Sequence, residues 1–175
     1  MYAVGGAQLS ETREKEALKE VEKLHISKNV WTPLSSLQYG RYGAAACCFG
    51  DEYLYAICGM GQTDPLDKVE RLSFSGMSDG WKLLPWRDKR WFPRALQNAM
   101  FMPESRRILV FGCDLTKEQR TSFLLEHTET ELGFEVKQAF KIKFEGSVYS
   151  RVKRGEDGEI RAIENQGTGG WKYTE

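Results

Sequence analysis

One short segment recurs four times in this chain at a fixed spacing of 53 residues, and this repeat limits the possible folds more than any other feature. Tyr2–Gly6 resembles Tyr55–Gly59, and the same register reaches Ile108–Gly112 and then Arg161–Asn165. Each copy has an apolar centre, and the first three copies close on the glycines Gly6, Gly59 and Gly112. We expect these glycines to end a strand at equivalent positions. A period of this length indicates a repeat architecture.

Other residues recur in the same register. Arg41 and Arg94 each stand 18 residues ahead of a closing glycine. Val21–Leu24 resembles Val69–Leu72, and an aromatic residue follows each of them. These aromatic residues are Trp31 and Trp81. Since both tryptophans recur in register, we expect them to pack between neighbouring units rather than to form a ligand surface.

Each unit contains four short apolar segments separated by turn residues, which predicts four strands. Four strands in a repeat of about 40–50 residues are typical of a propeller blade. The sequence therefore predicts an all-β fold, a partial propeller of about three and a half four-stranded blades whose ring this chain alone does not close. The expected blade boundaries are roughly 1–30 (a partial blade), 31–80, 81–130 and 131–175. Only Ser10–Glu20 breaks the pattern, and its helix-forming residues predict either a short helix or a solvated loop.

Taken together, these motifs resemble the kelch repeat. The residues that carry the resemblance in the first unit are Val4, Gly5, Gly6, Val21–Leu24, Trp31 and Arg41, and in the second unit Gly59, Val69–Leu72, Trp81 and Arg94. The third and fourth units depart from the pattern, because Phe111 and Glu164 replace the first glycine of the pair. Cys58 does so in the second unit. The resemblance implies a β-propeller, with this chain as the C-terminal part of a longer kelch domain. A partner chain or self-association could instead complete the ring.

The charge balance and the cysteine pattern exclude several classes of function. The chain has 25 Lys and Arg residues against 25 Asp and Glu residues, which argues against nucleic-acid binding. No apolar run is long enough for a membrane span, and the N-terminus lacks a signal-peptide pattern, so we expect a cytoplasmic protein. The four cysteines have no paired spacing and the chain has two histidines, so we expect free thiols, no metal and no cofactor.

No catalytic signature is present, so the sequence predicts a protein that is not an enzyme. We expect a non-catalytic protein–protein interaction module, a recognition or scaffold domain that binds its partner through loops at one face of the propeller. The candidate binding residues are Arg41, Tyr42, Trp86, Trp91 and Arg94. Trp and Arg are enriched at binding hot spots.

Two interpretations remain open for the recurring arginines. They could be structural residues that donate to carbonyl groups of a neighbouring blade. The kelch resemblance implies instead that they face the mouth of a central channel and grip an acidic peptide. The alternative functions are the substrate-receptor part of a ubiquitin ligase adaptor and, less favoured, a propeller enzyme.

Overall fold

The structure is a computed structural model, and it describes residues 1–10, 15–84, 95–114, 119–127, 134–141, 150–154, 160–165 and 171–173. These residues form β-strands and a single turn of 3-10 helix, η1 (Met77–Asp79). The strands are β1 (Tyr2–Val4), β2 (Ala7–Leu9), β3 (Lys15–Ala17), β4 (Val21–His25), β5 (Val30–Pro33), β6 (Ala45–Phe49), β7 (Tyr53–Ile57), β8 (Val69–Ser73), β9 (Lys82–Leu84), β10 (Ala95–Met102), β11 (Arg107–Asp114), β12 (Gln119–His127), β13 (Phe134–Lys141), β14 (Ser150–Arg154), β15 (Ile160–Asn165) and β16 (Trp171–Tyr173).

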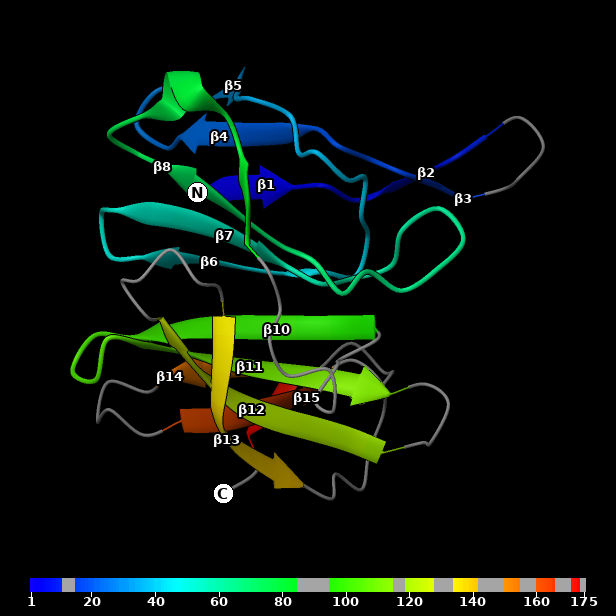
Figure 1. The fold of residues 1–175 in the computed structure, drawn as a ribbon, viewed down its shortest axis with the longest axis vertical. Helices are drawn as coiled ribbons and strands as arrows, with labels where there is room; N and C mark the ends of the chain where they lie inside the picture. Colours follow the sequence, from blue (N-terminus) through cyan, green and yellow to red (C-terminus); the bar gives the residue numbers. More distant parts are fainter. Residues whose placement is uncertain are drawn as a thin grey trace.

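The strands form four successive antiparallel sheets and a two-stranded sheet of β2 and β3, and none of them closes on itself within the described residues. The first sheet has the order β1-β4-β5, the second β6-β7-β8-β9, the third β10-β11-β12-β13 and the fourth β14-β15-β16. Figure 1 shows the first sheet at the top of the molecule, the second below it and the third below that. The first strands of the last three sheets are neighbours in space, because β6 contacts β10 and β10 contacts β14. The expected all-β fold of several antiparallel sheets is thus confirmed.

Each sheet ends one strand further along the chain than the expected blade boundary. We call aromatic-led the strand that contains or directly follows the recurring aromatic residue of each unit, namely β5 with Trp31, β9 after Trp81 and β13 with Phe134. Of these, β5 pairs with β4, β9 pairs with β8, and β13 pairs with β12. Each aromatic-led strand therefore completes the sheet that precedes it in the chain, whereas the expected boundaries placed it at the start of the next unit. The physical reason is the short connection between these strands, which favours an antiparallel hairpin.

Two hydrophobic clusters hold the first three sheets together, and β7 contributes to both because its side chains alternate between two faces. Leu54 and Ala56 pack with Val21 of the first sheet. Tyr55 and Ile57 pack with Ile108 and other residues of the third sheet. The second sheet is consequently buried on both faces.

Part of the segment Ser10–Glu20, for which a short helix or a solvated loop was expected, forms a strand, whereas residues 11–14 lie outside the described residues. Within it, Lys15–Ala17 forms β3, which pairs with Ala7–Leu9 as a two-stranded ribbon that projects from the first sheet (Figure 1). Gln62 stabilises the ribbon, since its side chain accepts from the Ala17 N–H at 3.0 Å and donates to the Lys15 carbonyl at 2.9 Å. These pairings override a weak helix propensity.

The repeat glycines are equivalent in the first two units and differ in the third. Gly6 (φ 132°) follows β1 and Gly59 (φ 93°) follows β7, both in the backbone region that favours glycine. Gly112 lies inside β11, so the expectation that it ends a strand is wrong. There β11 and β12 stay paired through Gly112 and on to Asp114. In the described part of the chain, no helix is long and apolar enough to cross a membrane.

Candidate functional site

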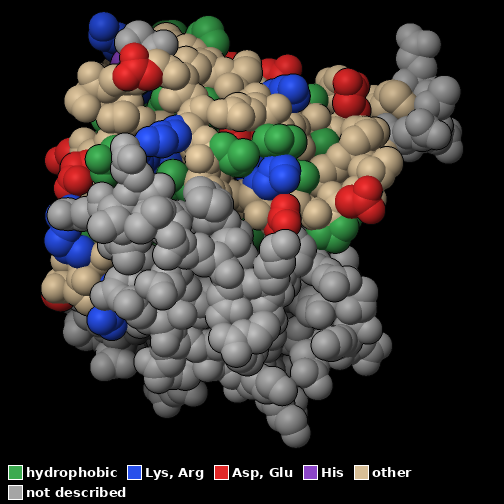
Figure 2. Space-filling model, viewed as in Figure 1, with side chains coloured by type: hydrophobic (Ala, Val, Ile, Leu, Met, Phe, Trp, Pro, Cys, Tyr) green, Lys and Arg blue, Asp and Glu red, His purple; other side chains and the backbone are tan. Residues whose placement is uncertain are grey.

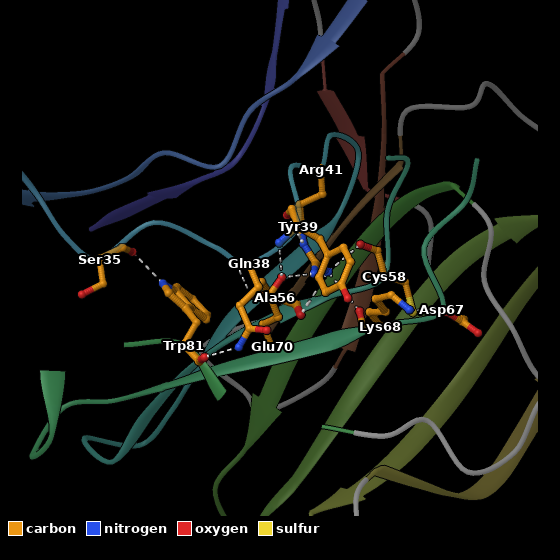
Figure 3. Close-up of polar contacts among 10 residues, drawn as sticks. All are labelled: Ser35, Gln38, Tyr39, Arg41, Ala56, Cys58, Asp67, Lys68, Glu70 and Trp81. Atoms are coloured by element: carbon orange, nitrogen blue, oxygen red, sulfur yellow. Dashed lines mark hydrogen bonds and ion pairs between the residues drawn. The ribbon is translucent and has the colours of Figure 1, made fainter. Parts of the chain in front are cut away.

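The most elaborate polar cluster in the described residues surrounds the ion pair between Arg41 and Glu70, both of which are 0% exposed (Figure 3). Glu70 lies on β8, and Arg41 lies at the end of the linker that leads from the first sheet to the second. The Glu70 carboxylate also accepts the backbone N–H groups of Gln38 at 2.6 Å and Tyr39 at 3.2 Å. A buried carboxylate requires such compensation, because its desolvation alone is costly.

The Arg41 guanidinium is satisfied entirely by the fold around it. Its Nη1 donates to the carbonyls of Cys58 at 2.8 Å and Lys68 at 3.0 Å, and Nη2 donates to Glu70. Burial lowers the pKa of Arg41, although the neighbouring Glu70 carboxylate acts in the opposite direction. These contacts match the structural interpretation of Arg41, and a fully buried guanidinium presents no surface to a partner peptide.

The linker is fixed to the second sheet at a second point, the indole of Trp81. Trp81 Nε1 donates to the Ser35 carbonyl at 2.7 Å, and the Gln38 side chain donates to the Trp81 carbonyl at 2.6 Å. Trp81 is 5% exposed and packs in the cluster between the first and second sheets. The expectation that it packs between units is confirmed.

The other predicted binding residues are only partly covered by the structure. Tyr42 is half-buried, forms an isolated β-bridge with Met60, and has the Lys15 ammonium 5.5 Å from its ring centroid. Trp86, Trp91 and Arg94 lie outside the described residues. Of the five predicted binding residues, the structure therefore describes Arg41 and Tyr42 alone.

Cys47, Cys48 and Cys58 are free thiols of low reactivity. Burial raises the pKa of Cys47 and of Cys58 to about 12. Burial also raises the pKa of Cys48. Thiolates are the nucleophilic and metal-binding form, so these residues are poor candidates for either role at neutral pH. Among the residues that the structure describes, no group of three or more His, Cys, Asp or Glu side chains could hold a metal ion.

Sequence reasoning missed an exposed apolar surface on the first sheet. Trp31 is 43% exposed, so the expectation that it packs between units is wrong for this residue, although its counterpart Trp81 is buried. Ile26 and Val30, at the β4–β5 hairpin, and Met1 are also exposed large apolar residues. Figure 2 shows hydrophobic side chains, interspersed with charged ones, reaching the surface at the upper end of the molecule, where the first sheet lies in Figure 1. No signal in the repeat could have identified this surface, because Trp31 and Trp81 occupy the same position of their units.

No protein-family model matches the chain, and no curated protein matches it. The assignment of a function rests on the repeat and on the surface of this chain.

Proposed function

We propose that this chain is a non-catalytic protein–protein interaction module built as part of a kelch-type β-propeller. The equivalence of the first two units supports the propeller assignment. Gly5 (φ 60°) and Cys58 (φ 51°) are both left-handed, and each is followed by a positive-φ glycine. The strand pairs are also in register, because Val4 pairs with Val21 and Ile57 pairs with Val69. The adjacency of β6, β10 and β14 is the arrangement expected of strands near a propeller axis.

The exposed apolar surface of the first sheet is the single observation that carries the binding role. Ile26, Val30 and Trp31 are exposed large apolar residues on one hairpin. Trp31 shares its face of the first sheet with the exposed Met1, and exposed apolar surface of this kind often marks a contact with another molecule. Tryptophan is also the residue most enriched at protein-binding hot spots. This surface replaces Arg41 as the leading candidate, while Tyr42, Trp86, Trp91 and Arg94 remain candidates for a second contact with an acidic peptide.

The chemistry of the thiols supports a non-catalytic role and a cytoplasmic location. With pKa values of about 12, Cys47 and Cys58 are almost entirely protonated at neutral pH. Free cysteines are usual in a reducing compartment and unusual in secreted proteins. Cys47 and Cys58 therefore contribute to the packing of the second sheet.

Affinity capture with matched variants tests the binding role. The wild-type chain, Trp31→Ala and Leu9→Ala would be immobilised and exposed to an extract of cells that express the protein. Leu9 is the matched control because it is equally an exposed apolar residue, on the β2–β3 ribbon away from the β4–β5 hairpin. We expect a protein that is retained by the wild type and by Leu9→Ala and released by Trp31→Ala. Retention of no protein by the wild-type chain would contradict the proposed function.

A further inference from the structure

Three polar side chains form a row across the second sheet, on the face that packs against the third sheet. The strand registers place Tyr55 opposite Arg71, and Arg71 opposite Lys82. Residues directly opposite each other in an antiparallel pair point to the same face of the sheet. Tyr55 identifies this face, because it packs in the cluster that contains Ile108 of the third sheet. Two cationic side chains are therefore direct neighbours on β8 and β9.

The row runs from the protein interior to the solvent. Tyr55 is buried, Arg71 is half-buried and Lys82 is exposed. The guanidinium carbon of Arg71 lies 4.2 Å from the ring centroid of Tyr53. Burial raises the pKa of Tyr55, and Arg71 is close enough to its hydroxyl to act in the opposite direction. A guanidinium that stacks on a ring keeps the N–H groups at its edge, and these can still donate to a ligand.

No carboxylate of the described residues neutralises this pair of cations. Within the described part of the chain, neither Arg71 nor Lys82 forms an ion pair. None of the positions that β6, β7, β8 and β9 contribute to this face is acidic. Glu52, in the turn between β6 and β7, is already joined to Arg106 at 2.8 Å. Like charges directly opposite each other destabilise a sheet, so the pair calls for an anionic ligand.

The first unit shows that the second cation is particular to the second unit. The same register there places Tyr2 opposite Lys23, and Lys23 opposite Thr32. The Lys23 ammonium lies 5.9 Å from the ring centroid of Tyr2, so a cation beside a tyrosine recurs. Thr32, however, stands where the second unit has Lys82. The first unit is thus a natural control that carries one cation in place of two.

We propose that Arg71 and Lys82 together bind a phosphate monoester group. Such a group carries about 1.5 to 2 negative charges near neutral pH, which matches two cations, whereas a carboxylate carries a single charge. The Arg71 guanidinium donates two N–H groups to two oxygens of the phosphate, and the Lys82 ammonium binds the same group as a compact charge. Tyr53 and Tyr55 are positioning residues that hold the guanidinium in place. This inference goes beyond the proposed function, since it does not use the apolar surface of the first sheet.

Nuclear magnetic resonance of the complete, isotope-labelled chain tests the site. Sodium phosphate would be titrated at about pH 8, where it is mostly dianionic, and sodium chloride would keep the ionic strength constant. We expect the backbone amide resonances of Arg71 and Lys82 to shift and to reach saturation. Resonances that stay in place, or that shift without saturating, would overturn the proposal.

Matched variants assign the binding to the two cations. Lys82→Gln removes one charge from an exposed residue and should weaken phosphate binding at least about threefold. Arg71→Lys keeps the charge but loses the paired N–H donors, so it should also weaken binding at least about threefold. Lys23→Gln is the control, because it removes the single cation of the first unit, and it should leave the affinity unchanged. Equal affinities of the wild type and Lys82→Gln would overturn the proposal, and this result does not depend on the stability of Arg71→Lys.

Asp88 needs a separate test, because it follows β9 by four residues and lies outside the described residues. Asp88→Asn should leave the affinity for phosphate unchanged. An affinity at least about fivefold higher in Asp88→Asn would overturn the proposal, because the chain would then supply its own anion to the two cations.

A phosphorylated partner and a small phosphorylated molecule offer the same phosphate group, and two further ligands separate these sources. Free phosphoserine and a short peptide that contains phosphoserine would be titrated into the same chain. Binding of the peptide about tenfold tighter than that of phosphoserine assigns the phosphate to a protein partner, whereas equal affinities assign it to a small molecule. An unphosphorylated peptide that binds as tightly as the phosphorylated one would overturn the proposal. None of these results affects the capture experiment with Trp31→Ala, so the proposed function is tested separately.

Discussion

Removing the charge of Glu70 should destabilise the fold strongly, although Glu70→Gln changes almost nothing in side-chain size. The glutamine can still accept one of the backbone N–H groups of Gln38 and Tyr39, but it no longer neutralises Arg41. Arg41 is 0% exposed, so its charge cannot be compensated by water. Breaking a buried ion pair from one side costs about 3–5 kcal/mol. The carbonyls of Cys58 and Lys68 still receive the guanidinium, which places our expectation near the lower end, at about 3 kcal/mol.

The matched control is an ion pair at the surface. Glu52 and Arg106 are joined at 2.8 Å, and their side chains are 48% and 53% exposed. Glu52→Gln makes the same chemical change where water replaces the lost partner, so it should cost less than about 1 kcal/mol. Urea unfolding at pH 7, followed by far-ultraviolet circular dichroism, gives the free energy of unfolding of both variants.

A double-mutant cycle then separates the ion pair from the other contacts of its members. Arg41→Met alone leaves Glu70 as a buried charge and should cost about 3–5 kcal/mol. Combined with Glu70→Gln, it leaves neither charge, so the double variant should cost about 2 kcal/mol less than the sum of the single variants. Additive losses, or a loss in Glu70→Gln no larger than that in Glu52→Gln, would refute the structural role assigned to Arg41.

Three further predictions address the thiols, the repeat glycine and the two tryptophans. Burial raises the pKa of Cys58 from 9.0 to about 12, so this thiol should resist alkylation by iodoacetamide at pH 8 until urea unfolds the chain, as site-resolved mass spectrometry would show. The contribution of Cys58 to the free energy of unfolding should be lost as the pH rises from about 9 to about 12, because only the unfolded thiol ionises in that interval, and unfolding curves at several pH values measure this loss. Gly59→Ala should destabilise the fold by about 1–3 kcal/mol more than Gly50→Ala, although both glycines have a positive φ. An added Cβ at Gly59 would lie 2.8 Å from the Ala44 Cβ, whereas one at Gly50 would meet nothing within 4 Å, so equal losses in urea unfolding would contradict the crowding argument. Trp81→Ala should lower the free energy of unfolding by about 3–5 kcal/mol and Trp31→Ala by well under half of that, since Trp81 is 5% exposed and Trp31 is 43% exposed. A comparable loss of stability for both variants in thermal unfolding would mean that the first sheet is covered in solution.

The sequence predicted the strands well because each strand is encoded locally. Apolar alternation and turn residues identify a segment such as Tyr53–Ile57 without reference to the rest of the chain. The 53-residue register added the equivalence of Val4 and Ile57, which the strand pairing bears out. The pairing partner of each aromatic-led strand could not be read in the same way, because the repeat has no beginning of its own and can be divided at any point.

The segment Lys15–Ala17 shows a different limit of sequence reasoning. Its composition favours a helix, but helix propensities amount to less than about 1 kcal/mol per residue, which tertiary contacts readily exceed. Here the contacts are pairing with Ala7–Leu9 and the two hydrogen bonds of Gln62, a residue of the next unit. No local pattern could indicate that a side chain so far along the chain would fix this ribbon.

The arginine and the tryptophan of the repeat show why burial cannot be assigned from a motif alone. Arg41 belongs to the linker between two sheets, so the function of its side chain is decided by the Glu70 that the following sheet presents. Trp31 and Trp81 occupy one position of the repeat, yet among the described sheets only Trp81 has a neighbour that covers it. In a repeat protein each unit buries its face against its neighbour, so equivalent residues can differ in exposure from one unit to another. The burial of a repeat residue therefore depends on the sheet that packs beside it, which is information that the motif itself does not contain.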